Sequence, residues 1–408
     1  MARVEGRRGP GRARRGGRSL AAASAGLAGL ALALWWSPAI SSAAGRAAAP
    51  TAYVTNVQLT SLSVYSGATL VGSVPNVGSG PAGIAIDPTG TRAYVTDYGF
   101  IDQPSTTVTP VDLAKDRALP PITVGVGPLA IAIPPQGKFA VVTLQGTGAQ
   151  PGHQAVEINL RSRAVSPPVE VGTNPQSLAI TPDGQTAWVA SLSSAEITPV
   201  SLTWPPRAGT PIPLPGTAPD AIAISPDGRT AYVADAEGAT LIPVDLATGT
   251  AGTPLDLVCH AAGDPGCTPH AVVLSPNGRT ADVAAAGSGD VMVVRLPALT
   301  VARVLPAGGY PDALGLSGRW LFVADGASNT MTVYTGLRSS KTVGGVTYPF
   351  GVAVVPGSAS GAGSVAAPAA PAAPAASAAT GHAGLAPGGI GTAPVPAPPA
   401  PFYGAPAG

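Results

Sequence analysis

The sequence predicts an all-β protein, a seven-bladed β-propeller built from four-stranded blades. Three observations support this fold: one motif recurs along the chain, each copy contains a tight-turn signature, and the repeat is long enough for four short strands. A repeat of roughly 40–50 residues with four strands is typical of a propeller blade. Successive copies begin at the prolines Pro81, Pro128, Pro175, Pro219, Pro269, Pro311 and Pro349.

The clearest copy begins at Pro219. Residues 221–225 and 230–235 are two short runs in which the residue types alternate as they do in β-strands. Pro226-Asp227-Gly228 lies between them. Pro fixes one turn dihedral, Asp bonds its own backbone and Gly takes the positive φ that closes a hairpin, so we expect an antiparallel pair. Two further β-rich runs complete a four-stranded meander, at residues 239–246 and 253–257.

The other copies keep the same order of elements. Their hairpin turns are expected at residues 88–90, 135–137, 182–184, 276–278 and 317–318. Their second strands are expected at residues 93–97, 140–144, 187–191, 281–285 and 321–325. The aromatic side chains of these strands most simply pack between blades; they are Tyr94, Trp188, Tyr232 and Phe322.

Residues 51–75 form an incomplete blade. They supply a second strand at 52–56 and two further strands, but no first strand precedes them. The missing strand is expected at residues 350–355, at the other end of the repeats. Pairing these segments completes the seventh blade and closes the ring, so that no sheet edge is left bare.

The repeated motif resembles that of the YVTN family of β-propeller proteins. Ala-Tyr-Val-Thr-Asn stands at residues 52–56, Tyr-Val-Thr-Asp at 94–97, and Pro-x-x-Ile-Ala-Ile at 81–86. The resemblance covers residues 51–356 and implies a seven-bladed propeller that is secreted or displayed at the surface. Related seven-bladed folds include lactonases and streptogramin lyases. A fold does not carry chemistry with it, so the function has to be argued from the site.

Residues 1–44 carry the pattern of a secretory signal peptide. Residues 1–18 are rich in Arg and Gly, residues 20–36 are apolar without charge, and residues 37–44 end in small side chains. Arg14-Arg15 leaves twin-arginine export open, and an uncleaved membrane anchor is the main alternative to cleavage. We expect a secreted or cell-envelope protein that touches the membrane only if this segment is retained.

Residues 357–408 contain no charged residue and consist mostly of Ala, Pro, Gly and Ser. Such a segment cannot bury enough surface to fold, so we expect a disordered tail. The first 50 residues hold eight Arg and one Glu, so the remainder carries a net charge of −6 although the whole chain is +1. This balance argues against nucleic-acid binding. We expect a monomer that meets a protein or glycan ligand at the envelope.

Propeller geometry places the residue after each anchoring proline at the mouth of the central tunnel. Three of these residues are apolar: Ala82, Leu129 and Phe350. Four consecutive blades instead offer Gln176, Asp220, His270 and Asp312. The second strands end on the same face and add Asp97, Asp235 and Asp325. We therefore expect a ligand site at this mouth.

Asp220, His270 and Asp312 also suggest a metal site, because carboxylate and imidazole ligands suit Ca²⁺, Mn²⁺ or a similar ion. No other cofactor is expected. The alternative is structural: Asp220 and Asp312 bond backbone groups at strand starts, and His270 is a solvated loop residue. Asp235 and its equivalents would then satisfy the turns that follow them.

Cys259 and Cys267 are the only cysteines. In an exported protein a disulfide between them is the default expectation, and it would pin the longest loop between blades. A zinc site formed by these cysteines with His260 and His270 is the alternative.

The sequence lacks a nucleophile elbow, a P-loop, an EF-hand loop and the zinc-protease helix motif. The favoured interpretation is a non-catalytic binding module at the cell envelope. The alternative is a metal-dependent, lactonase-like hydrolase or lyase with its site at the tunnel mouth. A redox-cofactor propeller is a third hypothesis, for which the chain offers no attachment motif.

Overall fold

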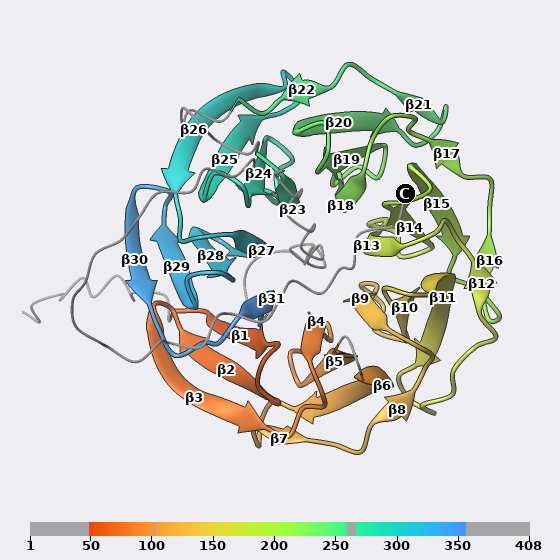
Figure 1. Ribbon diagram of the computed structural model, residues 1–408, viewed down its shortest axis with the longest axis vertical. Coiled ribbons are helices and arrows are strands. Elements are labelled where there is room, and N and C mark those ends of the chain that lie inside the picture. The colour runs from red at the N-terminus through yellow and green to blue at the C-terminus, as the bar shows by residue number, and fades with distance from the viewer. Residues whose placement is uncertain (1–48, 101–102, 259–266, 356–408) are drawn as a thin grey trace, which may run out of the picture. The chain divides into compact units, whose positions relative to one another are not determined.

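The computed structural model describes residues 49–100, 103–258 and 267–355. Every regular element in these ranges is a β-strand, and the strands form seven antiparallel sheets arranged as the blades of a ring (Figure 1). The predicted seven-bladed propeller is confirmed. None of the described segments forms a helix of the length and apolarity that a membrane span requires.

The first three complete blades follow one another along the chain. Blade 1 contains β4 (Pro81–Ile86), β5 (Arg92–Phe100), β6 (Gln103–Asp112) and a split outer strand, β7 (Arg117–Ala118) and β8 (Ile122–Thr123). Blade 2 contains β9 (Pro128–Ala132), β10 (Phe139–Gly146), β11 (Pro151–Asn159) and β12 (Val169–Glu170). Blade 3 contains β13 (Pro175–Ile180), β14 (Thr186–Ser191), β15 (Glu196–Ser201), β16 (Arg207–Ala208) and β17 (Ile212–Pro213).

The remaining blades keep this order. Blade 4 contains β18 (Pro219–Ile224), β19 (Thr230–Asp235), β20 (Thr240–Asp245), β21 (Thr250–Ala251) and β22 (Leu255–Asp256). Blade 5 contains β23 (Pro269–Leu274), β24 (Thr280–Ala285), β25 (Asp290–Arg295) and β26 (Thr300–Pro306). Blade 6 contains β27 (Pro311–Ser317), β28 (Trp320–Asp325), β29 (Thr330–Thr335) and β30 (Ser339–Val343).

Blade 7 joins the two ends of the repeat region. It combines β31 (Pro349–Val354) with β1 (Thr51–Asn56), β2 (Ser61–Ser66) and β3 (Thr69–Pro75). Tyr53 pairs with Ala353 and Val54 with Val352, and Figure 1 shows β31 in blue beside β1 in orange. The predicted closure is therefore confirmed.

The hairpin turns form as their residues dictate. In blade 4, Gly228 has a φ of 73° and donates its N–H to the Ser225 carbonyl at 2.8 Å. The Asp227 carboxylate accepts a hydrogen bond from the Arg229 N–H at 3.1 Å. Gly supplies the positive φ at no steric cost, and Asp replaces a backbone acceptor.

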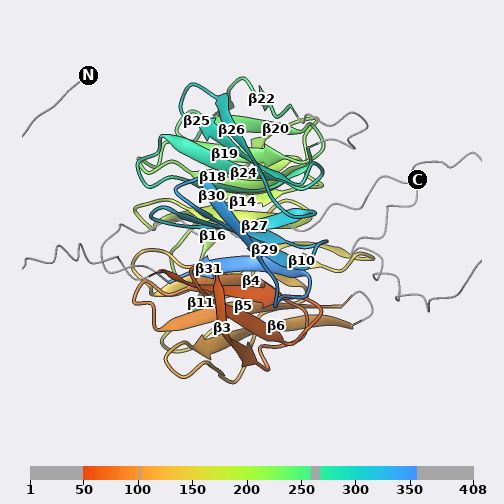
Figure 2. The same cartoon turned by 90° about the vertical axis from the view of Figure 1, so that its left-hand side faces the viewer.

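The two ends of the blades define two faces of the ring, which Figure 2 shows edge-on. We call the end with the anchoring prolines the proline face; it also carries the connections between second and third strands. The opposite end is the turn face, with the hairpins between first and second strands and the connections between third and fourth strands.

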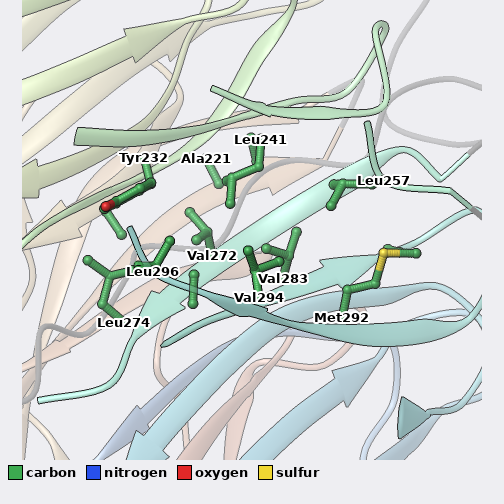
Figure 3. Packing of buried hydrophobic residues seen from close by; sticks show 14 of the residues in the cluster. Ala221, Tyr232, Leu241, Leu257, Val272, Leu274, Val283, Met292, Val294 and Leu296 are labelled. Carbon is green, nitrogen blue, oxygen red and sulfur yellow. The ribbon is translucent and has the colours of Figure 1, made fainter. Parts of the chain in front are cut away.

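The hydrophobic core lies between neighbouring blades. Figure 3 shows one such layer, a cluster that contains Tyr232 and Leu241 of blade 4 and Val272, Val283 and Met292 of blade 5. Three other interfaces are filled in the same way by Tyr94, Trp188 and Phe322. The predicted interblade role of these aromatic side chains is confirmed.

Candidate functional site

A β-bulge in each first strand positions the candidate residues. In blade 4, Pro219 pairs with Asp235 and Ala221 pairs with Ala234, so Asp220 has no residue opposite it. The same register shift follows the anchoring proline in the other six blades. A bulge redirects a side chain out of the regular alternation. Because the first strands are the innermost ones, these residues gather around the axis (Figure 1).

The axial residues divide into an apolar and a polar arc. Ala82, Leu129 and Phe350 pack together with Val57. The other arc consists of Gln176, Asp220, His270 and Asp312. All seven post-proline side chains are between 0% and 3% exposed. They fill the centre of the ring, whereas the sequence had predicted side chains at an open mouth.

The second strands follow the same division. Beside the apolar arc, Thr96 accepts the Gly83 N–H at 2.7 Å and donates its hydroxyl to the Leu129 carbonyl of the next blade at 2.7 Å. Thr55 and Thr143 also bond backbone groups at the bulges. Beside the polar arc the corresponding positions are Ala190, Ala234, Ala284 and Ala324. The polar arc therefore lacks these hydroxyl bridges.

The imidazole of His270 lies between two carboxylates from neighbouring blades. Its Nε2 is 3.6 Å from Oδ2 of Asp220, and its Nδ1 is 3.4 Å from Oδ1 of Asp312. All three side chains are fully buried. The imidazole of His270 also makes a T-shaped contact with the phenol ring of Tyr310, with centroids 5.1 Å apart and planes at 84°. Strands β18, β23 and β27 thus bring three predicted residues into one Asp–His–Asp cluster.

Burial and mutual charge set the protonation of this cluster. Burial raises the pKa of Asp220 to about 7 and that of Asp312 to about 6. Burial opposes the charged form of His270, but the carboxylates of Asp220 and Asp312 outweigh it and raise the pKa of the imidazole. The two carboxyl groups and the imidazole therefore form one coupled titrating group, in which each carboxylate favours the charged form of the imidazole.

Several polar atoms of the cluster have no hydrogen-bond partner among the described residues. They are both carboxylate oxygens of Asp220, Nε2 of His270 and Oδ2 of Asp312. Buried polar atoms are normally hydrogen-bonded, so this concentration of unsatisfied atoms marks the cluster as unusual. The structural alternative is accordingly wrong for these residues: His270 is a buried strand residue, and the two carboxylates face its ring, not backbone N–H groups.

The aspartates that end the second strands are engaged locally. Asp235 accepts hydrogen bonds from the N–H groups of Ala218 at 2.8 Å and Gly238 at 3.1 Å. Asp325 accepts the Gly308 N–H at 2.9 Å and the Thr332 hydroxyl at 2.7 Å. The structure thus supports the turn-satisfying role expected as the alternative for these residues.

Asp97 and Gln176 also have partners in their own blades. The Asp97 carboxylate accepts the hydroxyls of Thr107 at 2.6 Å and Thr109 at 2.8 Å. The Gln176 amide donates to Asn174 at 3.2 Å. Asp97 Oδ1 is still without a hydrogen-bond partner among the described residues, but Asp220, His270 and Asp312 are the predicted site residues that contact one another.

The metal hypothesis gains no geometric support. Across residues 49–100, 103–258 and 267–355, no three His, Cys, Asp or Glu side chains are placed to hold a metal ion. The two carboxylates address different nitrogens of His270, so the three groups do not converge on one point. A metal at Asp220, His270 and Asp312 stays a prediction.

Cys267 is buried, with 2% of its surface exposed. Its expected partner Cys259 and the alternative zinc ligand His260 lie outside the described residues, as do the predicted signal peptide at residues 1–44 and the whole of the predicted tail at residues 357–408. The disulfide stays a prediction.

Tyr310 and Tyr348 are site residues that the sequence reasoning missed. Each directly precedes an anchoring proline and has a positive φ, 58° for Tyr310 and 46° for Tyr348. Burial and the charge of Asp312 raise the pKa of both phenols. Aligning the residue before each proline would have revealed these aromatic side chains.

No family model matches the chain, and no curated protein matches it. Solved structures do resemble it. The periplasmic gluconolactonase of Pseudomonas aeruginosa superposes with a TM-score of 0.65 at 17% identity, covering 76% of this chain and 99% of that one. A putative 6-phosphogluconolactonase from Bacteroides uniformis superposes with a TM-score of 0.60 at 16% identity, covering 75% of this chain and 99% of that one.

Hydrazine synthase of Kuenenia stuttgartiensis gives a TM-score of 0.62 at 19% identity, covering 70% of this chain and 92% of that one. Identities this low show a shared propeller fold and nothing further. Lactonase-like propellers are among the neighbours, as the resemblance implied, whereas the YVTN label rests on the sequence motifs alone.

Proposed function

We propose that this chain is an exported, non-catalytic binding propeller of the cell envelope. Its ligand, a protein or a glycan, contacts the proline face above the Asp220–His270–Asp312 cluster. The observation that carries the proposal is the inward orientation of the cluster, in which each imidazole nitrogen faces a carboxylate of a neighbouring blade. A general base has to come within about 2.6–3.2 Å of the proton it removes. Groups that are fully buried and face one another are not within that distance of a substrate, so the cluster fits a role in shaping and rigidifying the ligand-binding face better than one in catalysis.

Export is supported by the N-terminal sequence pattern and by the location stated for one structural neighbour, a periplasmic enzyme. A binding role is supported by the polar arc, which holds unsatisfied carboxylate oxygens of Asp220 and Asp312 and the contact between the rings of His270 and Tyr310.

The test compares wild type with Asp220→Asn, which keeps the size of the side chain. Binding to a glycan array and to fractionated envelope proteins is measured for both, with Asp227→Asn on the turn face as the control. Asp220→Asn is expected to weaken binding at least tenfold, and Asp227→Asn to leave it unchanged. Equal loss in both variants, or no loss in either, would refute a ligand site above the cluster.

A lactonase-like hydrolase is the second candidate. It is favoured by the raised pKa of His270 between two carboxylates and by the resemblance to gluconolactonases. Hydrolysis of glucono-δ-lactone is followed with a pH indicator, with and without Ca²⁺ and a chelator. Turnover above the spontaneous rate that His270→Gln abolishes would replace the binding proposal with this one.

A further inference from the structure

The cationic side chains are segregated to one face of the ring, where they outnumber the turn aspartates Asp87, Asp112, Asp116, Asp183, Asp227 and Asp245. Every Lys and Arg in the described residues lies on the turn face or on an outer strand, and all of them are exposed. In blades 4, 5 and 6 an arginine directly follows the turn glycine: Arg229, Arg279 and Arg319. Lys138 takes this place in blade 2. The cations thus form a broad ring across the turn face.

The proline face carries the opposite charge. Among the described residues it holds no Lys or Arg, but it presents Glu170, Glu196, Glu237, Asp256 and Asp290 at least partly to solvent. The carboxylates of Asp220, Asp312 and Asp325 lie beneath them. Charge on this scale orients a protein near a charged surface.

The cations of the turn face are largely free of carboxylate partners. Lys115 with Asp112, at 3.5 Å, is the only ion pair between a Lys or Arg and a carboxylate within the described ranges. The turn aspartates are occupied by their own hairpins: Asp183 accepts the Gln185 N–H, and Asp227 accepts the Arg229 N–H. These carboxylates stay ionised and offset part of the positive charge, but the cations remain in excess on this face. Hydrogen bonds from Ser225 to Asp227 and from Thr248 to Asp245, together with the charge of Arg229, lower the pKa of both carboxyl groups.

An exposed aromatic side chain accompanies these cations. Trp204 follows β15 on the turn face and is 45% exposed, with its ring stacked on Phe139 at a centroid distance of 5.8 Å. Tryptophan favours the boundary between water and lipid, because its body is apolar and its N–H is polar.

We propose that the turn face docks on an anionic phospholipid bilayer. A broad ring of exposed cations matches a surface of negative headgroups better than it matches an extended chain in a groove, and Trp204 is exposed on the same face. This contact is independent of the N-terminal segment. It is also independent of the ligand site, because the acidic proline face then points away from the membrane.

The test is co-sedimentation of the chain, as recovered from an exporting host, with vesicles of equal parts phosphatidylglycerol and phosphatidylcholine. Each Lys or Arg near such a surface adds about 1 kcal/mol, and about 1.4 kcal/mol is tenfold. Arg229→Gln with Arg279→Gln is therefore expected to lower the partition coefficient about 25-fold. Trp204→Ala is expected to weaken it several-fold and to remove a vesicle-induced blue shift in fluorescence.

The matched control lowers the net charge equally on the other face, with Leu59→Glu and Val126→Glu on exposed loops. It is expected to bind vesicles like wild type. Pure phosphatidylcholine vesicles and high salt are expected to abolish binding. Binding lost equally in both double variants, or binding to soluble polyphosphate but not to vesicles, would overturn the proposal.

Discussion

Asp282 occupies a position where five of the other six blades place an aromatic side chain and blade 2 places Val141, and this predicts a substitution that stabilises the protein. It pairs with Val273 and Val293 in register, and both valines belong to the cluster that packs blade 5 on blade 6. The side chain is 3% exposed, and its Oδ1 has no hydrogen-bond partner among the described residues. Burial raises the pKa of Asp282 from 3.8 to about 7.

The raised pKa of Asp282 determines how the free energy of unfolding depends on pH. Between pH 4 and 7 the folded state holds a proton that the unfolded chain has released, so the free energy of unfolding falls as pH rises. At about 1.4 kcal/mol per pKa unit, the ionised Asp282 costs on the order of 4 kcal/mol above pH 7.

Asp282→Asn removes that cost. Urea unfolding of wild type and variant is compared at pH 5 and pH 8. The variant is expected to be about 1.5 kcal/mol more stable than wild type at pH 5, where the unfolded Asp is already ionised, and about 4 kcal/mol more stable at pH 8. A difference that does not change with pH, or a variant less stable than wild type at pH 8, would show that Asp282 is not desolvated as described.

Three further substitutions probe the core, the loop before blade 1 and the cluster. Phe322→Ala empties a fully buried site between blades and is expected to lower the free energy of unfolding by about 3–5 kcal/mol in urea titrations. Gly78→Ala would bring a Cβ within 2.0 Å of Asp97 Oδ1 at a φ of 95°, so thermal unfolding should reveal a loss of at least about 1 kcal/mol. Asp220→Asn removes one of two carboxylates that favour the charged imidazole, and NMR titration is expected to show a lower pKa for His270.

The fold could be predicted because local and global signals agree. Pro226-Asp227-Gly228 specifies a hairpin on its own, and its recurrence fixes the length of a blade. Ring closure followed from the absence of a first strand before Tyr53, since an unpaired inner edge would be exposed.

The site was predicted only in part. Pro219 and its equivalents marked the right residues, but alternation along a strand does not reveal a bulge, so the burial of Asp220 and His270 was missed. Contacts between blades 4, 5 and 6 join residues about 40–50 positions apart, and the sequence alone cannot show that one imidazole lies between two carboxylates.

A double-mutant cycle between His270 and Asp312 tests this arrangement most directly. Unfolding free energies are measured for wild type, His270→Gln, Asp312→Asn and the double variant at pH 6. The 3.4 Å contact in a buried site predicts a coupling energy of at least about 1 kcal/mol. Effects of the two substitutions that simply add would contradict an Asp–His–Asp cluster at the axis of the ring.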